Sequence, residues 1–223
     1  MQVKKLTFKN EKLSFKKKRL ASIILIFQMD YKNTKCHLNF TNPFELLVGT
    51  ILSAQCTDER VNQVTKYLFK KYKTAADYVY LNPNDLERDI RPTGFFRNKA
   101  RAIINSCRVL AEKYDGSVPA SMKKLIELDG VGRKTANVVL GNCFGIPGII
   151  VDTHVRRLAK RLGFSDNTDP NKIEKDLMGL VPKKKWTFFS NALSDHGRVV
   201  CKARKPLCKI CNISKFCPSA ELN

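Results

Sequence analysis

The strongest chemical signal in the sequence is a run of four cysteines near its C-terminal end, spaced C-x6-C-x2-C-x5-C. Structural zinc usually takes two short pairs of ligands, whereas a [4Fe–4S] cluster takes four thiolates, one per iron, and accepts uneven spacers. One short pair flanked by longer gaps therefore favours the [4Fe–4S] cluster, with zinc as the alternative. The intervening residues are too basic to form an apolar core, so a chance cluster of buried thiols is disfavoured. The four expected ligands are Cys201, Cys208, Cys211 and Cys217.

A second signal is a glycine pair followed at once by basic residues. Gly130, Val131 and Gly132 precede Arg133 and Lys134 at the start of an expected helix. Glycines permit a tight hairpin, and the N-terminus of the next helix presents free N–H groups and a positive dipole. Val131 is expected to plug the space between the two helices. The pattern predicts a phosphate contact, although helix–turn–helix packing alone would also use two glycines.

Lys134 is placed for a further role as a nucleophile. A free lysine amine has a pKa of about 10.4, so reactivity at neutral pH requires a decrease of roughly three units, or about 4 kcal/mol. The positive helix end, adjacent Arg133 and desolvation in a cleft would all act in that direction. The alternative is that Lys134 is a second phosphate contact.

Asp152 follows the apolar run 149–151 and precedes an expected helix, which gives it the position of an N-cap. Capping alone is sufficient to explain an aspartate there. However, the helix from Lys134 rises only about 15 Å and the return to Asp152 can span roughly 25 Å, so the carboxylate can come back beside the amine.

The secondary structure that must position these residues is expected to be helical along almost the whole chain. Apolar residues recur at helical spacing over 95–114 and 133–144, and no sustained strand alternation is found. Helix starts are signalled at Asn42-Pro43, Thr57 and Asn82-Pro83, and again at Asp169-Pro170. We therefore predict an all-α fold.

The charge distribution points to a polyanionic partner. The chain has 41 Lys and Arg against 20 Asp and Glu, net +21, of which residues 1–35 carry +8 and residues 183–223 carry +7. Nucleic acid is the favoured partner, through counterion release. A membrane surface or signal sequence is the alternative, but the apolar run 20–27 is too short to span and no small-residue cleavage site follows it. Residues 1–16 are expected to form a basic, disordered tail.

The remaining cysteines, 36, 56, 107 and 143, are expected to be small buried hydrophobes without disulfides. An iron–sulfur site and free thiols together indicate a reducing compartment, the cytoplasm.

Several motifs together resemble endonuclease III, the DNA glycosylase and abasic-site lyase family of base-excision repair. They are Leu128–Val138, Val151–His154, Leu52–Gln55 and the four-cysteine run, and the resemblance covers about residues 18 to 218. It implies the helix-hairpin-helix glycosylase fold with a DNA-binding cleft between two domains. The implied domains are a six-helix barrel over 36–146, with the hairpin at about 121–144, and a [4Fe–4S] cluster domain of 17–35 plus 147–223.

The resemblance also implies roles for single residues. Lys134 would attack the sugar C1′ and form a Schiff base, and Asp152 would stabilise the cationic sugar. Gln55 would fill the space left by the flipped nucleotide, Phe95 would be a wedge in the duplex, and His154 would line the cleft. For Gln55 and His154 a hydrogen-bonded residue without a catalytic role is the alternative, and for Phe95 it is core packing.

The implied activity is removal of oxidised pyrimidines from double-stranded DNA, followed by β-elimination at the abasic site. The protein is expected to be a monomer in the bacterial cytoplasm, associated with the nucleoid and not with a membrane. The loop 202–207 is expected to bind phosphate through its basic side chains Lys202, Arg204 and Lys205.

The chain departs from the family at Asp129, which stands where proline is usual and should loosen the hairpin. The catalytic glutamate of adenine-mismatch relatives is replaced at Gly49, and Lys134 takes the place of the tyrosine found in mismatch pyrimidine glycosylases. The competing functions are a non-catalytic iron–sulfur DNA-binding module and a zinc-stabilised nucleic-acid adaptor. The joint presence of Lys134 and Asp152 disfavours both.

Overall fold

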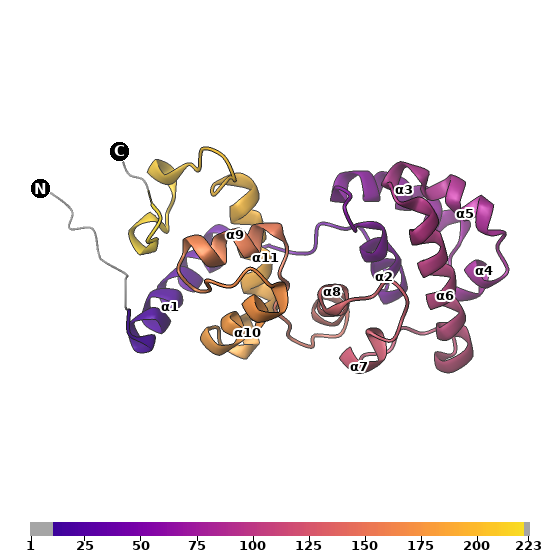
Figure 1. Cartoon of the computed structure of the whole chain (residues 1–223), viewed down its shortest axis with the longest axis horizontal. Coiled ribbons are helices and arrows are strands. Elements are labelled where there is room, and N and C mark those ends of the chain that lie inside the picture. The colour runs from indigo at the N-terminus through magenta and orange to yellow at the C-terminus, as the bar shows by residue number, and fades with distance from the viewer. Residues whose placement is uncertain (1–10, 221–223) are drawn as a thin grey trace, which may run out of the picture. The chain divides into compact units, whose positions relative to one another are not determined.

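The computed structural model describes residues 11–220 and divides the chain into two compact units. One unit is the middle segment, 36–146, and the other combines 1–35 with 147–223. Within the described range every regular element is a helix and no strand is present, as expected for an all-α fold (Figure 1). In the same range, no helix has both the length and the hydropathy needed to cross a membrane.

The middle unit is organised around α2, Pro43–Leu52, which is buried along nearly its whole length. Its sequence PFELLVGTIL is apolar on all sides, which is typical of a helix enclosed by others. Asn42 starts the helix by accepting a hydrogen bond from the Glu45 backbone N–H at 2.9 Å. Helix α2 packs against α3, α6 and α8 and lies between α6 and α8 (Figure 1).

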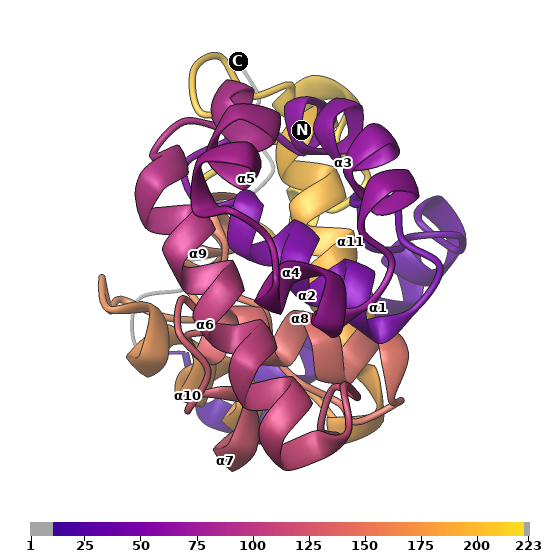
Figure 2. The same ribbon diagram turned by 90° about the vertical axis from the view of Figure 1, so that its right-hand side faces the viewer.

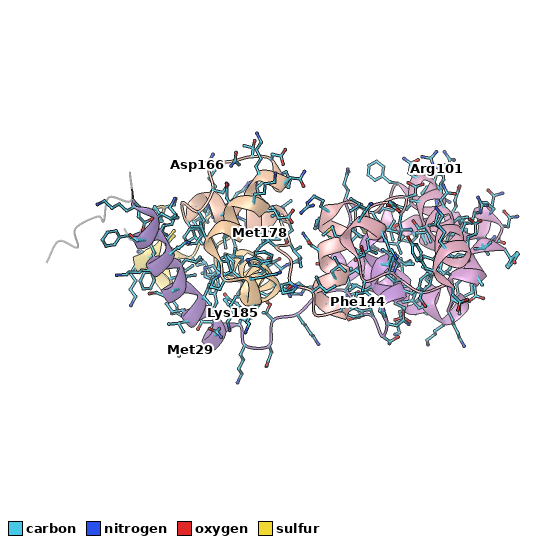
Figure 3. The ribbon with its side chains drawn as sticks, turned by 90° about the horizontal axis from the view of Figure 1, so that it is seen from below. Met29, Arg101, Phe144, Asp166, Met178 and Lys185 are labelled. Atoms are coloured by element: carbon cyan, nitrogen blue, oxygen red, sulfur yellow. The ribbon has the colours of Figure 1, made fainter. Side chains whose placement is uncertain are left out.

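The longest helix of this unit is α6, Phe96–Tyr114, and it has the expected amphipathic character. Arg101 points away from the core, whereas the neighbouring Ile103 and Ile104 are buried (Figure 3). α6 packs against α2, α4 and α5, so one helix supports much of the unit (Figure 2). The other elements are α3 (Asp58–Lys71), α4 (Ala75–Val79), α5 (Pro83–Ile90), η1 (Arg91–Thr93), α7 (Met122–Leu125) and α8 (Arg133–Cys143).

The second unit joins the first helix of the chain to its last ones. Apolar residues of α1, Leu13–Asp30, share one core with residues of α9, α10 and α11. Leu20, Ile23 and Phe27 lie on one face of α1 at helical spacing and are almost completely buried. The elements after residue 147 are α9 (Thr153–Arg161), α10 (Pro170–Leu180), η2 (Lys183–Lys185), α11 (Trp186–Val199), η3 (Cys208–Ile210) and η4 (Ser214–Phe216).

A buried arginine fastens α1 to the C-terminal segment. The Arg19 guanidinium donates to the carbonyl oxygens of Leu162 at 2.8 Å and Phe216 at 2.9 Å. It also pairs with the Glu11 carboxylate at 2.7 Å. The tail expected over 1–16 therefore needs correction at its inner end, because Glu11 is held in place and α1 begins at Leu13. The rest of that expected tail, residues 1–10, lies outside the described residues.

Candidate active site and cluster site

The hairpin before α8 depends on one glycine more than on the other. Gly130 has φ 74°, and a Cβ there would lie 2.9 Å from the Ala102 Cβ of α6. Gly132 has φ −92° and open space around its missing Cβ. Val131 between them is buried, as expected for a plug. The close packing of the hairpin on α6 therefore requires Gly130, whereas Gly132 leaves the start of α8 uncovered.

Asp129 is attached to α6 at both its side chain and its backbone. Its carboxylate accepts a hydrogen bond from the Asn105 amide at 3.1 Å, and its carbonyl accepts one from the Ser106 hydroxyl at 2.7 Å. We expected the replacement of proline by aspartate to loosen the hairpin. Instead the structure provides two bonds at this residue that restrain it.

Lys134 lies in the first turn of α8 with its side chain exposed. Gly132 is the N-cap, so no side chain caps this helix start and the dipole is open to an anion. Burial raises the pKa of the Cys36 thiol, opposed by a backbone hydrogen bond at Leu38 and, more weakly, by the charge of Lys134. The desolvation expected for Lys134 is not observed, because its side chain is exposed.

Asp152 is the N-cap of α9, and both of its carboxylate oxygens have partners. Oδ1 accepts from the Val155 backbone N–H at 2.7 Å, and Oδ2 accepts from the Ser194 hydroxyl at 2.7 Å. The capping role predicted from the sequence is therefore observed. Because Lys134 and Asp152 belong to different units, the pairing of their side chains stays a prediction.

His154 is half-buried on α9 and packs closely against α11. A Cβ at Gly197 would lie 2.8 Å from the His154 Cβ, and the imidazole Nδ1 lies 3.2 Å from the Arg157 guanidinium. Burial lowers the pKa of His154, opposed by the nearby Asp152 carboxylate. These contacts explain His154 as a packing residue, and its expected place in a DNA-facing cleft stays a prediction.

The four predicted cluster ligands line one pocket in the second unit. All four are half-buried, and burial raises the pKa of Cys217 to about 11, with smaller contributions from the charges of Cys201, Cys211 and Cys208. Among the described residues, no three or more Cys, His, Asp or Glu side chains come close enough together to hold a single metal ion.

Polar groups from α9 and α11 reach this pocket. The Arg161 guanidinium donates to the Cys201 sulfur at 3.2 Å, and the His196 Nε2 lies 3.5 Å from the Cys211 sulfur. The other His196 nitrogen, Nδ1, lies 2.8 Å from the Tyr31 hydroxyl of α1. N–H donors aimed at sulfur ligands are a regular feature of iron–sulfur sites.

The basic loop, which we define as residues 202–207, is held by its backbone and leaves its charges exposed. Arg161 donates to the Lys202 carbonyl at 2.7 Å and to the Ala203 carbonyl at 2.9 Å. The basic side chains Lys202, Arg204 and Lys205 are all exposed. A hydrogen-bonded backbone that presents three exposed cations is suited to bind phosphate.

Gln55 and Phe95 both lie in tight turns of the middle unit with exposed side chains. Each has a left-handed backbone, with φ 52° at Gln55 and φ 48° at Phe95. The Phe95 side chain is 62% exposed, so core packing does not account for it. Non-glycine residues adopt this conformation at a cost, and such residues gather at functional sites.

The comparisons with known proteins agree with the motifs. Residues 48–183 match the model of the HhH-GPD superfamily of base excision DNA repair proteins. An endonuclease III from Synechocystis is 51% identical, over 94% of this chain and 96% of its own length. The chain belongs to the endonuclease III family.

Further members support the assignment. Endonuclease III of Bacillus subtilis is 46% identical over 86% of this chain and 88% of its own length. A solved structure described as a trapped endonuclease III–DNA covalent intermediate is 44% identical with a TM-score of 0.87, covering 92% of this chain and 96% of that one. A thermostable thymine-DNA glycosylase is 27% identical with a TM-score of 0.82, covering 93% and 97%. The expected fold class, and the activity class of DNA glycosylase and abasic-site lyase, are thereby confirmed.

Sequence reasoning missed several residues that shape these endonuclease III sites. Ser194 and His196 project from α11 toward Asp152 and Cys211, and nothing in their spacing distinguishes them from ordinary helix residues. For Arg161 the sequence does offer a signal, because it lies four residues after Arg157 and therefore on the same face of α9. In the structure both arginines donate to backbone carbonyls at the start of the cysteine run. One expectation was wrong in part. Cys107 is buried, but the other three cysteines outside the run are only half-buried. Cys36 and Cys56 lie in connections between helices, and Cys143 is the last residue of α8.

Proposed function

We propose that this chain removes oxidised pyrimidines from duplex DNA and then cleaves the strand, with Lys134 as the nucleophile. The observation that carries the proposal is the exposed Lys134 amine at the uncapped start of α8, directly after a hairpin fixed on α6. An endonuclease III that is 44% identical has been trapped as a covalent intermediate with DNA. A lysine amine is the group expected to form such a bond with a sugar carbon.

The proposed reaction begins with extrusion of the damaged nucleotide, which costs a few kcal/mol and is easiest where stacking is weakened. The unprotonated Lys134 amine attacks C1′ of the sugar, and the base leaves with the electron pair of the glycosidic bond and takes up the proton that the attached nitrogen releases. Asp152 stabilises the positive charge that develops on the sugar. The lone pair of the attached nitrogen then expels the ring oxygen, which takes a proton from solvent, and the resulting iminium makes the 2′ proton acidic. Loss of that proton breaks the C3′–O bond and cleaves the strand on the 3′ side of the lesion.

We further propose that the four cysteines hold a [4Fe–4S] cluster. The four thiols line one pocket and can supply the one-per-iron ligands of such a cluster, and their spacing, one short pair between longer gaps, favours it over zinc. The cluster, when bound, would fix the ends of the basic loop, since Cys201 and Cys208 flank it. Purified protein should contain about four iron and four sulfide per chain. Stoichiometric zinc without iron after anaerobic preparation would contradict the assignment.

The partner is double-stranded DNA, and we propose that its damaged pyrimidines and abasic sites are the targets of a monomeric protein. Free thiols and an iron–sulfur cluster both favour the cytoplasm as the compartment. The competing function is a non-catalytic iron–sulfur DNA-binding module, in which Lys134 would only contact phosphate.

Borohydride trapping distinguishes the two functions. The wild-type chain should form a stable adduct on duplexes that carry thymine glycol or an abasic site. Lys134→Gln should abolish the adduct while damaged duplex is still bound. Arg133→Gln removes the neighbouring charge and is the matched control, which should weaken binding but give full trapping at saturating protein. Lys134→Gln could instead bind less duplex but give the same yield of trapped adduct per bound duplex as wild type. In that case Lys134 is a phosphate contact and the proposed chemistry is wrong.

A further inference from the structure

Lys99 is a buried lysine whose ammonium group binds two backbone carbonyls. It projects from the first turn of α6 and is 5% exposed. Its Nζ donates to the Leu52 carbonyl at 2.8 Å and to the Thr93 carbonyl at 2.7 Å. Lysine is almost never buried without a partner, so a buried lysine needs an explanation.

No carboxylate in the described part of the chain forms an ion pair with this ammonium. Among the described residues no salt bridge involves Lys99, and burial lowers its pKa, opposed only by the charge of Cys56. Leu52 is the last residue of α2 and Thr93 the last residue of η1. Carbonyls at helix ends lack intrahelical partners and carry partial negative charge. Lys99 therefore satisfies two orphan carbonyls that converge from separate segments.

Both carbonyls directly precede the turns that present Gln55 and Phe95. Gln55 follows Leu52 by three residues, and Phe95 follows Thr93 by two. Both have the strained left-handed backbone and an exposed side chain. The Lys99 backbone N–H also donates to the Phe95 carbonyl, at 3.1 Å. Lys99 is thus bonded to the residue before the Gln55 turn, Leu52, and, at the other turn, to both Thr93 and Phe95 itself.

We infer that Lys99 is a positioning residue that holds Gln55 and Phe95 at a fixed separation, so that the two side chains can enter the duplex together around an extruded nucleotide. The inference rests on the proposed function, in which Gln55 fills the space and Phe95 acts as a wedge. It assigns no chemical step to Lys99. If the two side chains are already positioned before DNA binds, binding does not have to include the entropy cost of ordering the two turns.

The test compares two substrates under single-turnover conditions. Lys99→Met keeps the apolar stem and removes the cation. It should slow base removal from a thymine glycol duplex by about tenfold to 100-fold, the range for a misplaced positioning group. Cleavage of a single-stranded abasic oligonucleotide, where no duplex has to be entered, should change less than about twofold by the same reasoning. Lys113→Met, an exposed position on the same helix, is the matched control and should leave both rates unchanged.

A double-mutant cycle gives a second readout. If Lys99 acts through the two turns, its effect should nearly vanish in a Gln55→Ala, Phe95→Ala background, because coupled residues are non-additive. Equal loss on duplex and single strand, or full additivity, would overturn the inference. If the Gln55→Ala, Phe95→Ala variant itself keeps the wild-type duplex rate, the proposed roles of those residues fail, and the inference falls with them. If Lys99→Met does not fold at the assay temperature, Lys99→Arg serves instead. Arginine keeps the positive charge, but its planar guanidinium cannot place a single nitrogen between the two carbonyls.

Discussion

Replacing Asp152 by asparagine should separate its structural role from the catalytic role proposed for it. The structure gives the carboxylate two bonds, one to the Val155 N–H and one to the Ser194 hydroxyl. Asparagine keeps an oxygen for the cap, and its amide can donate to Ser194, whose hydroxyl can turn to accept. Asn is about as good an N-cap as Asp, so the free energy of unfolding should fall by less than about 1 kcal/mol.

The catalytic effect should be much larger than that structural effect. Without the negative charge, the cationic sugar loses its counter-charge in the transition state. We expect base removal to slow by about 10² or more, equal to about 2.7 kcal/mol in the barrier. On a preformed abasic site no base has to leave, so the same variant should lose less activity. Asp152→Ala removes both bonds and should lower stability by about 2 kcal/mol, which leaves most domains folded.

Single-turnover rates on paired thymine glycol and abasic duplexes, with thermal unfolding of each variant, provide the measurement. Ser194→Ala is the matched control, because it removes one partner of Asp152 and leaves the carboxylate charged. It should slow both reactions far less than Asp152→Asn. Equal losses for Asp152→Asn on the two substrates would show that Asp152 only shapes the site, and the division of roles would be refuted.

Three further predictions address the hairpin, the basic loop and acid stability. Gly130→Ala should destabilise the protein by about 1–3 kcal/mol, because the new Cβ meets Ala102 at 2.9 Å and φ is 74°; Gly132→Ala, with open space and φ −92°, should fold normally in the same thermal-unfolding assay. Changing all three basic side chains of the basic loop to alanine should reduce the salt dependence of DNA affinity by up to about three phosphate contacts, and an unchanged slope in a titration would contradict the loop's assigned role. A backbone hydrogen bond from Thr74, helped by one from Lys73, holds the pKa of Asp77 below its ordinary value, against the opposing effect of burial. A carboxyl group whose pKa is lowered by folding stabilises the folded state at pH values above its ordinary pKa. That stabilisation is lost as the pH falls through the pKa of the folded state. The stability of Asp77→Asn should therefore depend less on pH than that of wild type below about pH 4.

The sequence predicted those parts of the structure that depend on local signals. Asn42, Thr57, Asn82 and Asp169 each accept a backbone hydrogen bond at the helix start that they indicated. The apolar period over 95–114 placed α6 within one residue of its start. Local signals were sufficient here because a cap and an amphipathic face are each defined within a few turns of one helix.

Contacts between distant segments could not be predicted in the same way. The Lys99 ammonium meets a carbonyl 47 residues earlier, and nothing near Lys99 in sequence indicates that it is buried. Ser194 reaches Asp152 across 42 residues for the same reason. Asp129 was expected to loosen the hairpin because its partner, Asn105, lies 24 residues away on α6. In each case the bond is set by packing, which a linear pattern does not record.

The construction of the second unit from both chain ends has a consequence for how the protein is made. α1 ends at Asp30, but the helix α11 that completes its core begins at Trp186. At 5–20 residues per second, a ribosome needs roughly 8 to 30 s to synthesise the chain between them. During most of that time the middle unit can fold while the apolar face of α1 lacks its partners, because the first of them, α9, begins only at Thr153. A translation pause after residue 146 should therefore yield a folded middle unit with an unprotected N-terminal helix, open to proteolysis between them.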